Sequence, residues 1–185
     1  MSGVLAGRVA IITGAGGGLG AAHARVFASE GCAVVVNDIN TAAAQAVVDE
    51  IIRAGGKAVV NSSDITNYDD SLNAVKQAID SFGDLHIVLN NAGVNRDRMF
   101  ASMTEQEGDT IMAVHLKGHF CISSHAVHYW RGQSKEGKAV DARIINTTSG
   151  AGLQGSIGQS NYAAAKAGIA ALTLNQAAEL ARYNI

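Results

Sequence analysis

The sequence predicts an α/β fold built on a doubly wound parallel sheet. Short apolar runs rich in Val and Ile alternate with longer Ala-rich segments of helical period, which is the pattern of parallel strands joined by helical crossovers. The runs are mostly continuous in apolar residues, as expected for strands that helices cover on both faces. A chain of 185 residues with 48% apolar residues has the size and the core of one domain. We therefore expect a single domain over residues 1–185.

Five short β-rich runs are expected to form the strands of this sheet. In chain order they are Val9–Thr13, Ala33–Asp38, Ala58–Asn61, Ile87–Asn90 and Arg143–Thr148.

Helices are expected between the strands, and capping residues or glycines mark several of their ends. The second helix follows Asn40 and stops near Gly55. The fourth opens with Thr104 and Glu107, a capping box in which each side chain satisfies the other residue's backbone N–H. The polar segment Arg131–Asp141 is expected to be a surface loop. The expected helices cover Gly18–Glu30, Asn40 to Gly55, Thr66–Phe82, Thr104–Trp130 and Asn161–Arg182.

Charge and cysteine content argue against several classes of protein. The net charge of −2 is too even for binding a polyanion by bulk charge, so no nucleic-acid partner is expected. Cys32 and Cys121 form no Cys-x-x-Cys pair, which disfavours a disulfide framework and favours a reducing compartment. No secretory signal is visible, and the longest charge-free stretch, Ile144–Ala165, is interrupted by polar residues. We therefore expect a cytoplasmic protein that does not enter a membrane.

A glycine-rich turn, Thr13–Gly20, follows the first expected strand and leads into a helix. Such a turn can bring backbone N–H groups against a pyrophosphate. The six-residue dinucleotide fingerprint fits only in its Ala-ended form, as Gly16-x-Gly18-x-x-Ala21, so a plain glycine turn is the alternative. The residues expected to contact a cofactor here are Gly14, Gly16, Gly18, Leu19 and Gly20.

Asp38 supports the dinucleotide interpretation. It ends the second expected strand 20 residues after Gly18, where a carboxylate can accept hydrogen bonds from the adenosine ribose and repel a 2′-phosphate. No Arg or Lys follows closely, and Gly17 stands where NADP binding would favour a basic residue. The sequence therefore predicts NAD rather than NADP, the alternative being an Asp that only caps a turn.

Ser149, Tyr162 and Lys166 form a second constellation. Tyr162 and Lys166 are four residues apart, so they point to one face of a helix. An ammonium beside a phenol favours the phenolate, as a general base requires. Ser149 can hydrogen-bond a substrate oxygen, and Lys166 can also reach ribose hydroxyls. The alternative is an aromatic that packs on a helix beside a solvated Lys.

These motifs together resemble the short-chain dehydrogenase/reductase family. The chain matches the family's T-G-x-x-x-G-x-G in Thr13–Gly20, its N-N-A-G in Asn90–Gly93 and its S-x12-Y-x3-K in the Ser149 constellation. The resemblance implies a Rossmann fold that binds NAD and a small-molecule substrate. It further implies that Ser149, Tyr162 and Lys166 are catalytic. The cofactor is expected to be lined by Asp64, Ile65, Asn91, Ala92 and Gly93, and to be contacted by Tyr162 and Lys166 as well. The resemblance also implies a homodimer or homotetramer in which the fourth and fifth long helices of one copy pair with those of another.

His115 departs from the family pattern, which has an Asn at this position of the fourth helix. An imidazole can also hold a water, so we expect His115 to join the catalytic group, unless it only packs within its helix. The same substitution, with Arg96-Asp97-Arg98, is similar to members that act as (3R)-hydroxyacyl-CoA or 17β-hydroxysteroid dehydrogenases. His115 and His119 also have a spacing that can bind a metal, but no carboxylate completes a hydrolytic motif, so no metal is expected.

The chain stops at Ile185, whereas family members continue into further strands and a substrate-covering lid. We therefore expect strand order 3-2-1-4-5 with the C-terminal strands missing, a C-terminally truncated protein and an open fifth strand.

The leading function is hydride transfer between the nicotinamide of NAD and a secondary alcohol, either a 3-hydroxyacyl-CoA or a hydroxysteroid-like compound. The alternative is a catalytically silent NAD-binding or regulatory module. A nicotinamide-using epimerase or dehydratase ranks last, because such enzymes need a larger C-terminal domain.

Overall fold

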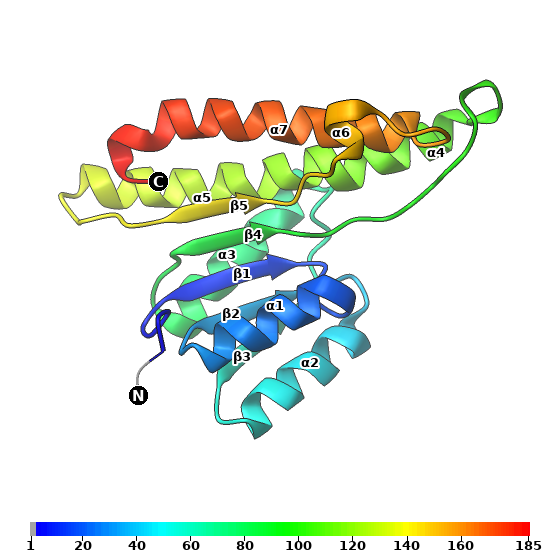
Figure 1. The fold of residues 1–185 in the computed structure, drawn as a ribbon. Coiled ribbons are helices and arrows are strands. Elements are labelled where there is room, and N and C mark those ends of the chain that lie inside the picture. Colours follow the sequence, from blue (N-terminus) through cyan, green and yellow to red (C-terminus); the bar gives the residue numbers. More distant parts are fainter. Residues whose placement is uncertain (1–2) are drawn as a thin grey trace.

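The protein forms a five-stranded parallel sheet with helices on both faces (Figure 1). The structure, a computed structural model, describes residues 3–185. The spatial strand order is β3-β2-β1-β4-β5, and every neighbouring pair is parallel. This confirms the predicted fold class and order. The strands are β1 (Val9–Thr13), β2 (Ala33–Asn37), β3 (Lys57–Asn61), β4 (Ile87–Asn90) and β5 (Arg143–Asn146).

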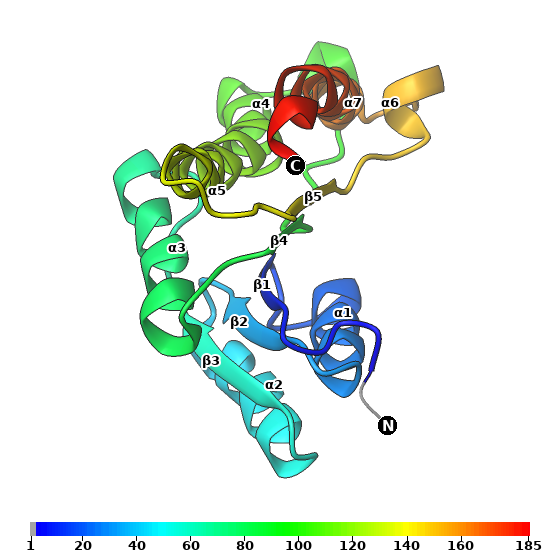
Figure 2. The ribbon, with the colours of Figure 1, turned by 90° about the vertical axis from the view of Figure 1, so that its left-hand side faces the viewer.

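The helices divide between the two faces according to the alternation of side chains in the strands. Ala10 and Ile12 of β1 pack in one buried cluster with α1 and α2, whereas Val9 and Ile11 pack in a second with α3 and α5. Figure 2 shows α3 and α5 on one side of the sheet and α1 on the other. The long helices are α1 (Gly18–Ser29), α2 (Thr41–Arg53), α3 (Tyr68–Phe82), α5 (Gly118–Lys135) and α7 (Ser160–Leu180).

The expected fourth helix is divided into three segments. The capping box of Thr104 and Glu107 is confirmed and begins α4 (Glu105–Ile111). The chain then widens into the π-helical segment η2 (Met112–Lys117) before α5 continues to Lys135. The expected loop Arg131–Asp141 is therefore wrong for its first five residues. No residue there breaks the helix, which ends instead near Gly137, whose φ is +78°.

Three further differences from the expected elements occur in the part of the chain after β4. The strand β5 is two residues shorter than expected. The Thr147 N–H still donates to the Asn90 carbonyl at 3.0 Å, but the Thr147 carbonyl and the Thr148 hydroxyl bind Lys166 of α7. The short segments η1 (Phe100–Ser102) and α6 (Ala151–Gln154) were not predicted. One to two turns of helix carry too little periodicity to be recognised in a sequence. The chain ends with η3 (Ala181–Tyr183).

A polar residue ends every strand at the carboxyl edge of the sheet. The Asn37 side-chain amide donates to Asn61 Oδ1 at 2.7 Å, and Asn90 donates to Asn146 Oδ1 at 2.9 Å. These partners are in register across neighbouring strands. Because the strands are parallel, the loops that leave them, including the glycine turn and the segment after β5, meet at this one edge.

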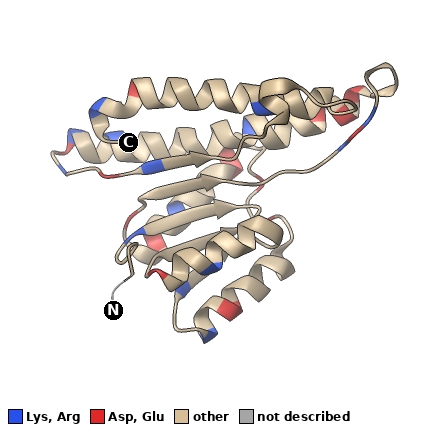
Figure 3. Ribbon diagram, in the orientation of Figure 1, with Lys and Arg blue, Asp and Glu red and all other residues tan. Residues whose placement is uncertain are grey.

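Positively and negatively charged residues are interspersed along the ribbon in Figure 3. Among residues 3–185, no helix has both the length and the apolar character needed to cross a membrane.

Candidate active site

The glycine turn has a shape that only glycine can adopt at its critical positions. Gly14 and Gly18 have φ of +63° and +52°, the left-handed region that other residues avoid. A Cβ on Gly20 would collide with the carbonyl oxygen of Gly14 and lie 2.6 Å from Asn91 Nδ2. The turn leads directly into α1, whose N-cap residue Gly17 provides no side-chain hydrogen bond. The first N–H groups of α1 therefore remain available to a ligand.

Substitution of Gly20 by Ala is expected to destabilise the protein by about 1–3 kcal/mol, because the added methyl group overpacks the turn. Dinucleotide binding should weaken in the same variant. Gly17→Ala is the matched control, since no atom lies within 4 Å of a Cβ there and its φ of −162° suits any residue. Urea unfolding measures both variants. Equal midpoints for Gly20→Ala and Gly17→Ala would contradict the prediction.

Asp38 lies just beyond β2, half-buried beside the glycine turn. Its carboxylate accepts hydrogen bonds from the backbone N–H groups of Gly16 and Asn40, both at 2.9 Å. Asp38 therefore does cap the turn, as the alternative interpretation of this residue expected. Two carboxylate oxygens offer about four acceptor sites, so these bonds leave capacity for ribose hydroxyls.

The segment after β4 holds the glycine turn in place. The Thr13 hydroxyl accepts from the backbone N–H groups of Asn91 and Ala92, both at 3.0 Å. The Asn91 side chain donates to the carbonyls of Thr13 and Gly14 at 3.1 and 3.3 Å. Asn91 therefore joins the ends of β1 and β4 through its side-chain amide nitrogen. Gly93 beside it is exposed.

Asp64 and Ile65 follow β3 and differ in exposure. Asp64 is exposed, and its carboxylate accepts from the backbone and hydroxyl of Thr66 at 2.8 Å. The Ile65 side chain is buried, and a Cβ on Gly118 would lie 2.7 Å from its Cδ1. A ligand at this position would thus meet Asp64 or the backbone rather than the Ile65 side chain.

Lys166 is buried behind Tyr162. Its Nζ lies 5.6 Å from the centre of the Tyr162 ring and donates to the carbonyl of Thr147 at 2.5 Å. The side chain is only 2% exposed, so the alternative of a solvated Lys is wrong. Burial lowers the pKa of Lys166 from 10.5 to about 8, because an ammonium loses hydration in the interior. An ammonium with two further N–H donors thus stands next to a phenol.

Ser149 and α6 complete this side of the site. Ser149 Oγ accepts from the backbone N–H of Ala151 at 3.2 Å, which leaves the hydroxyl proton free to donate to a substrate. Gly152 was not predicted as a site residue, yet a Cβ there would lie 2.6 Å from the backbone carbon of Lys166. Close packing of α6 on α7 therefore requires Gly152. The cluster of glycines after Ser149 is the only feature of the sequence that draws attention to Gly152. It does not tell which helix Gly152 packs against.

His115 lies in η2 with its ring at an edge to that of Tyr162, the centroids 5.1 Å apart. Its Nε2 contacts the carbonyl of Val94 at 2.8 Å and the Val94 N–H at 3.2 Å. The shorter contact assigns the proton to Nε2, so Nδ1 is the unprotonated nitrogen. Burial lowers the pKa of His115, which keeps the imidazole neutral. The structure thus brings His115, Tyr162 and Lys166 together, as predicted from the sequence.

The stability of the fold is expected to decrease as the pH falls from 6.5 to 5. Burial, with Lys166 and His115 nearby, lowers the pKa of His119 from 6.5 to about 3. In this window the unfolded chain binds a proton that the folded chain excludes, which costs about 1.4 kcal/mol per pH unit for one such group. Urea unfolding at pH 7.5 and 5 measures the difference, and His119→Leu should remove much of it. The exposed His128 on the same helix gives the control, His128→Gln. Identical midpoints at the two pH values would refute the expectation.

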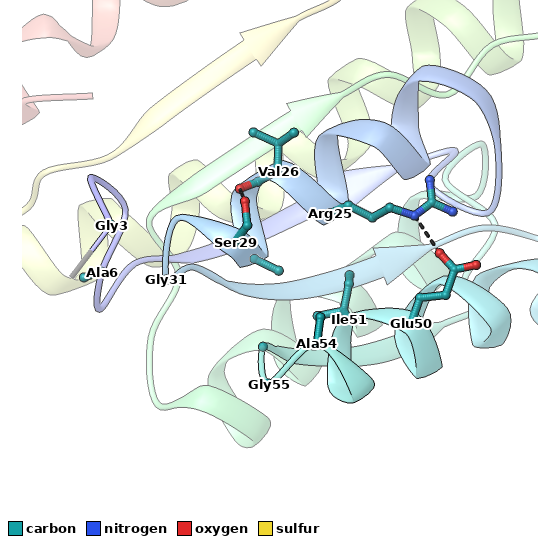
Figure 4. Close-up of a pocket in the computed structure, with 12 residues that line it drawn as sticks. Gly3, Ala6, Arg25, Val26, Ser29, Gly31, Glu50, Ile51, Ala54 and Gly55 are labelled. Atoms are coloured by element: carbon teal, nitrogen blue, oxygen red, sulfur yellow. Dashed lines mark hydrogen bonds and ion pairs between the residues drawn. The ribbon is translucent and has the colours of Figure 1, made fainter. Parts of the chain in front are cut away.

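A pocket of about 580 Å³ lies at the other edge of the sheet, between the C-terminal halves of α1 and α2 (Figure 4). Small residues line much of it, and Arg25 pairs with Glu50 across it at 2.6 Å. The two charged residues of its lining, Arg25 and Glu50, are paired with each other, and none of the residues predicted to bind a cofactor or act in catalysis lines it. This pocket is therefore separate from the candidate active site.

Three comparisons place this geometry among known proteins. The sequence model of the short chain dehydrogenase family matches residues 8–185. Hydroxyacyl-CoA dehydrogenase ChsB1 of Mycobacterium tuberculosis is 48% identical over 98% of this chain and 59% of its own length. The peroxisomal hydratase-dehydrogenase-epimerase of Saccharomyces cerevisiae is 46% identical over 96% of this chain and 20% of its own. The chain thus spans about three fifths or less of these relatives.

A solved structure is also closely similar. The crystal structure of a short chain dehydrogenase from Mycobacterium avium superposes with a TM-score of 0.97 at 57% identity, covering 98% of this chain and 66% of that one.

Proposed function

The chain belongs to the short-chain dehydrogenase family, and from this premise we propose that it transfers hydride between a secondary alcohol and a nicotinamide dinucleotide. The observation that carries the proposal is the buried Lys166 with Nζ 5.6 Å from the Tyr162 ring. A buried ammonium is costly, and a position beside a phenol that must ionise gives it a chemical reason.

The residues at the carboxyl edge fit a nicotinamide dinucleotide. The glycine turn leaves N–H groups of α1 for the pyrophosphate, Asp38 offers acceptors to the adenosine ribose, and Lys166 has donors for the other ribose. We assign the further contacts to Leu19, Asp64, Ile65, Asn91, Ala92 and Gly93. NAD is preferred over NADP because the Asp38 carboxylate would repel a 2′-phosphate. When bound, the nicotinamide supplies the carbon that accepts or gives the hydride.

Tyr162 acts as the general base in the direction of alcohol oxidation. Its phenolate removes the alcohol proton, and the Lys166 ammonium stabilises that phenolate. The Ser149 hydroxyl donates a hydrogen bond to the substrate oxygen while the carbonyl forms. His115 holds the Val94 segment through Nε2. Its Nδ1 is left to accept a hydrogen bond from a donor such as water.

We propose a 3-hydroxyacyl thioester or a hydroxysteroid-like alcohol as substrate. Two segments carry exposed apolar side chains, Phe100 of η1 at 80% and Ile157, which precedes α7, at 90%. The Arg98 N–H donates to the Gly158 carbonyl at 2.7 Å, so these segments lie side by side. Exposed apolar surface on these segments suits a substrate with an alkyl chain or a ring system. ChsB1, the relative from M. tuberculosis, is itself named a hydroxyacyl-CoA dehydrogenase.

Titration with NAD and NADP, followed by NADH fluorescence after adding 3-hydroxybutyryl-CoA, tests the proposal. Tight NAD binding with turnover is the expected result. Binding without turnover of this or a hydroxysteroid substrate would instead support the alternative of a silent NAD-binding or regulatory module. Absence of binding to either dinucleotide would overturn the assignment of the site.

We propose that the protein is a homodimer or homotetramer paired through α5 and α7. Phe120 of α5 is 51% exposed and Leu174 of α7 is 74% exposed, and α7 also presents the small side chains Ala167 and Ala171 to solvent. Apolar and small residues on long helices allow close pairing. Light scattering at micromolar concentration should give at least twice the chain mass, and a monomer would contradict the proposal.

We propose a cytoplasmic location, since Cys32 and Cys121 are buried free thiols of the kind that a reducing compartment preserves. Several relatives are named peroxisomal enzymes. Cell fractionation with an antibody to the chain distinguishes the two compartments.

A further inference from the structure

Asn161 is a buried polar residue immediately before Tyr162. It is only 7% exposed, although it lies in the first turn of α7, where polar side chains usually face solvent or cap the helix. Gln159 is the N-cap residue and Ser160 is the first residue of the helix, so Asn161 lies inside the helix rather than at its cap. A buried amide at this position therefore needs a further physical reason.

The partners of the Asn161 amide nitrogen lie in two other segments of the chain. Its Nδ2 donates to the carbonyl of Arg96, in the loop after β4, and to the carbonyl of Glu107, in α4, both at 3.2 Å. Its Oδ1 accepts from the backbone N–H of Tyr162 at 2.8 Å. The two carbonyls can only accept and the N–H can only donate, so these partners fix the orientation of the amide. Both N–H donors of Asn161 thus join elements that are far apart in the sequence.

Two further hydrogen bonds join the loop after β4 to the start of α7. The backbone N–H of Arg98 donates to the Gly158 carbonyl at 2.7 Å, and the Gln159 side chain donates to the Asp97 carboxylate at 3.0 Å. They lie at the end of the molecule where Figure 1 shows α4 and the start of α7. The contact between the two side chains is exposed to water, which weakens it, whereas hydrogen bonds of the buried Asn161 amide are stronger in a low dielectric. Asn161 is therefore the buried link among these contacts.

The loop after β4 also contacts His115. The Val94 carbonyl lies 2.8 Å from His115 Nε2, and the Arg96 carbonyl, two residues later, binds Asn161. One short stretch of backbone is therefore bonded to the imidazole on one side and to the residue before the base on the other. The rings of His115 and Tyr162 meet at an edge with their centroids 5.1 Å apart. The spacing of these two rings thus depends on how α7 is fastened to this stretch.

We propose that Asn161 is a positioning residue, which fixes the Tyr162 phenol relative to His115 by fastening the first turn of α7 to the loop after β4 and to α4. The inference rests on the proposed function of Tyr162 as the base. A general base must lie within hydrogen-bond reach of the proton that it removes. A displacement of about 1 Å can lower the rate about 10²-fold, so an amide that fixes this turn acts on the rate through Tyr162.

The first test is hydrogen exchange of the Arg98 backbone amide in the wild type and in Asn161→Ala. The variant lacks both links to the neighbouring segments, so the bond from Arg98 to Gly158 should open more often and exchange about tenfold faster. Asn73→Ala is the control, because Asn73 is exposed on α3 and its amide donates only to Asp70, at 3.0 Å. Its Arg98 exchange should match the wild type. This readout needs no turnover, and unchanged exchange in a folded Asn161→Ala overturns the inference.

The second test is a double-mutant cycle on kcat for NAD-linked alcohol oxidation. Asn161→Ala should lower kcat by about 10–100-fold, while the Kd for NAD changes by less than about threefold. In the Tyr162→Phe background the same substitution should lower the residual kcat by less than about threefold, because no base hydroxyl remains to be positioned. A loss by the same factor in both backgrounds refutes the positioning role, since a purely structural amide would act equally in each.

Asn161→Asp separates the links to the neighbouring segments from the local bond to Tyr162. The carboxylate keeps the shape and the acceptor of the amide but has no donor for the carbonyls of Arg96 and Glu107. It should therefore lose kcat as Asn161→Ala does, and it replaces that variant in both tests if Asn161→Ala does not fold. A wild-type kcat in Asn161→Asp overturns the inference. If the wild type has no turnover, the proposed function fails and the exchange of Arg98 decides the inference alone.

Discussion

Replacement of Tyr162 by Phe is expected to lower kcat for alcohol oxidation by about 10²–10⁴-fold, the usual contribution of a positioned general base. Phe keeps the ring that packs at an edge to His115 and lies over Lys166, so the site should keep its shape. The affinity for NAD should therefore change by less than about threefold. Initial rates of NADH formation at saturating substrate, together with a fluorescence titration of cofactor, separate the two quantities.

Tyr68→Phe provides the matched control for this variant. Tyr68 begins α3, where its hydroxyl contacts Ser124 at 3.1 Å, and it has no role in the proposed chemistry. Its kcat should equal that of the wild type. If Tyr162→Phe retains more than a third of the wild-type kcat, Tyr162 is not the base.

Replacement of Asp38 by Asn is expected to weaken NAD binding by about 10–100-fold, because a hydrogen bond to a charged group contributes about 1.5–3 kcal/mol. Binding of NADP should improve at the same time, since the negative charge that repels a 2′-phosphate is gone. The ratio of the two dissociation constants therefore shifts further than either alone. Isothermal titration with both cofactors measures it.

Asp38 also accepts hydrogen bonds from Gly16 and Asn40, so thermal unfolding of Asp38→Asn must accompany the titration. The amide retains one of the two acceptor oxygens, so one of these hydrogen bonds is lost and the free energy of unfolding is expected to fall by about 1 kcal/mol. Asp49→Asn, an exposed carboxylate on α2, is the control for loss of one charge. An unchanged cofactor ratio in a stable Asp38→Asn would show that the carboxylate is only a cap.

The sheet and the glycine turn could be predicted because their signals are local. Each strand is a short apolar run between helical segments, and right-handed crossovers then leave few possible strand orders. The turn at Gly14–Gly20 needs residues without a Cβ at several positions close in sequence, and glycine is the only residue that provides this. Tyr162 and Lys166 are four residues apart, so helical geometry alone sets them on one face.

The ends of the helices were harder to predict from the sequence. The helix that ends at Lys135 was expected to stop five residues earlier, because polar residues after Trp130 have the composition of a loop. In the fold Trp130 is buried and its indole N–H donates to the Leu85 carbonyl at 2.7 Å, and the helix continues over the surface. A polar composition indicates that a segment is exposed to solvent. It does not distinguish a loop from an exposed turn of helix.

The sequence alone therefore determined the class of fold, the strand order and the identity of the residues that gather at one edge. Only the tertiary structure decided their environment. It buries Lys166 and His119 and occupies His115 Nε2 with Val94. The physical reason is that periodicity and turn chemistry act between residues a few positions apart. Burial and hydrogen bonding depend instead on elements such as β4, η2, α5 and α7, which meet only after folding.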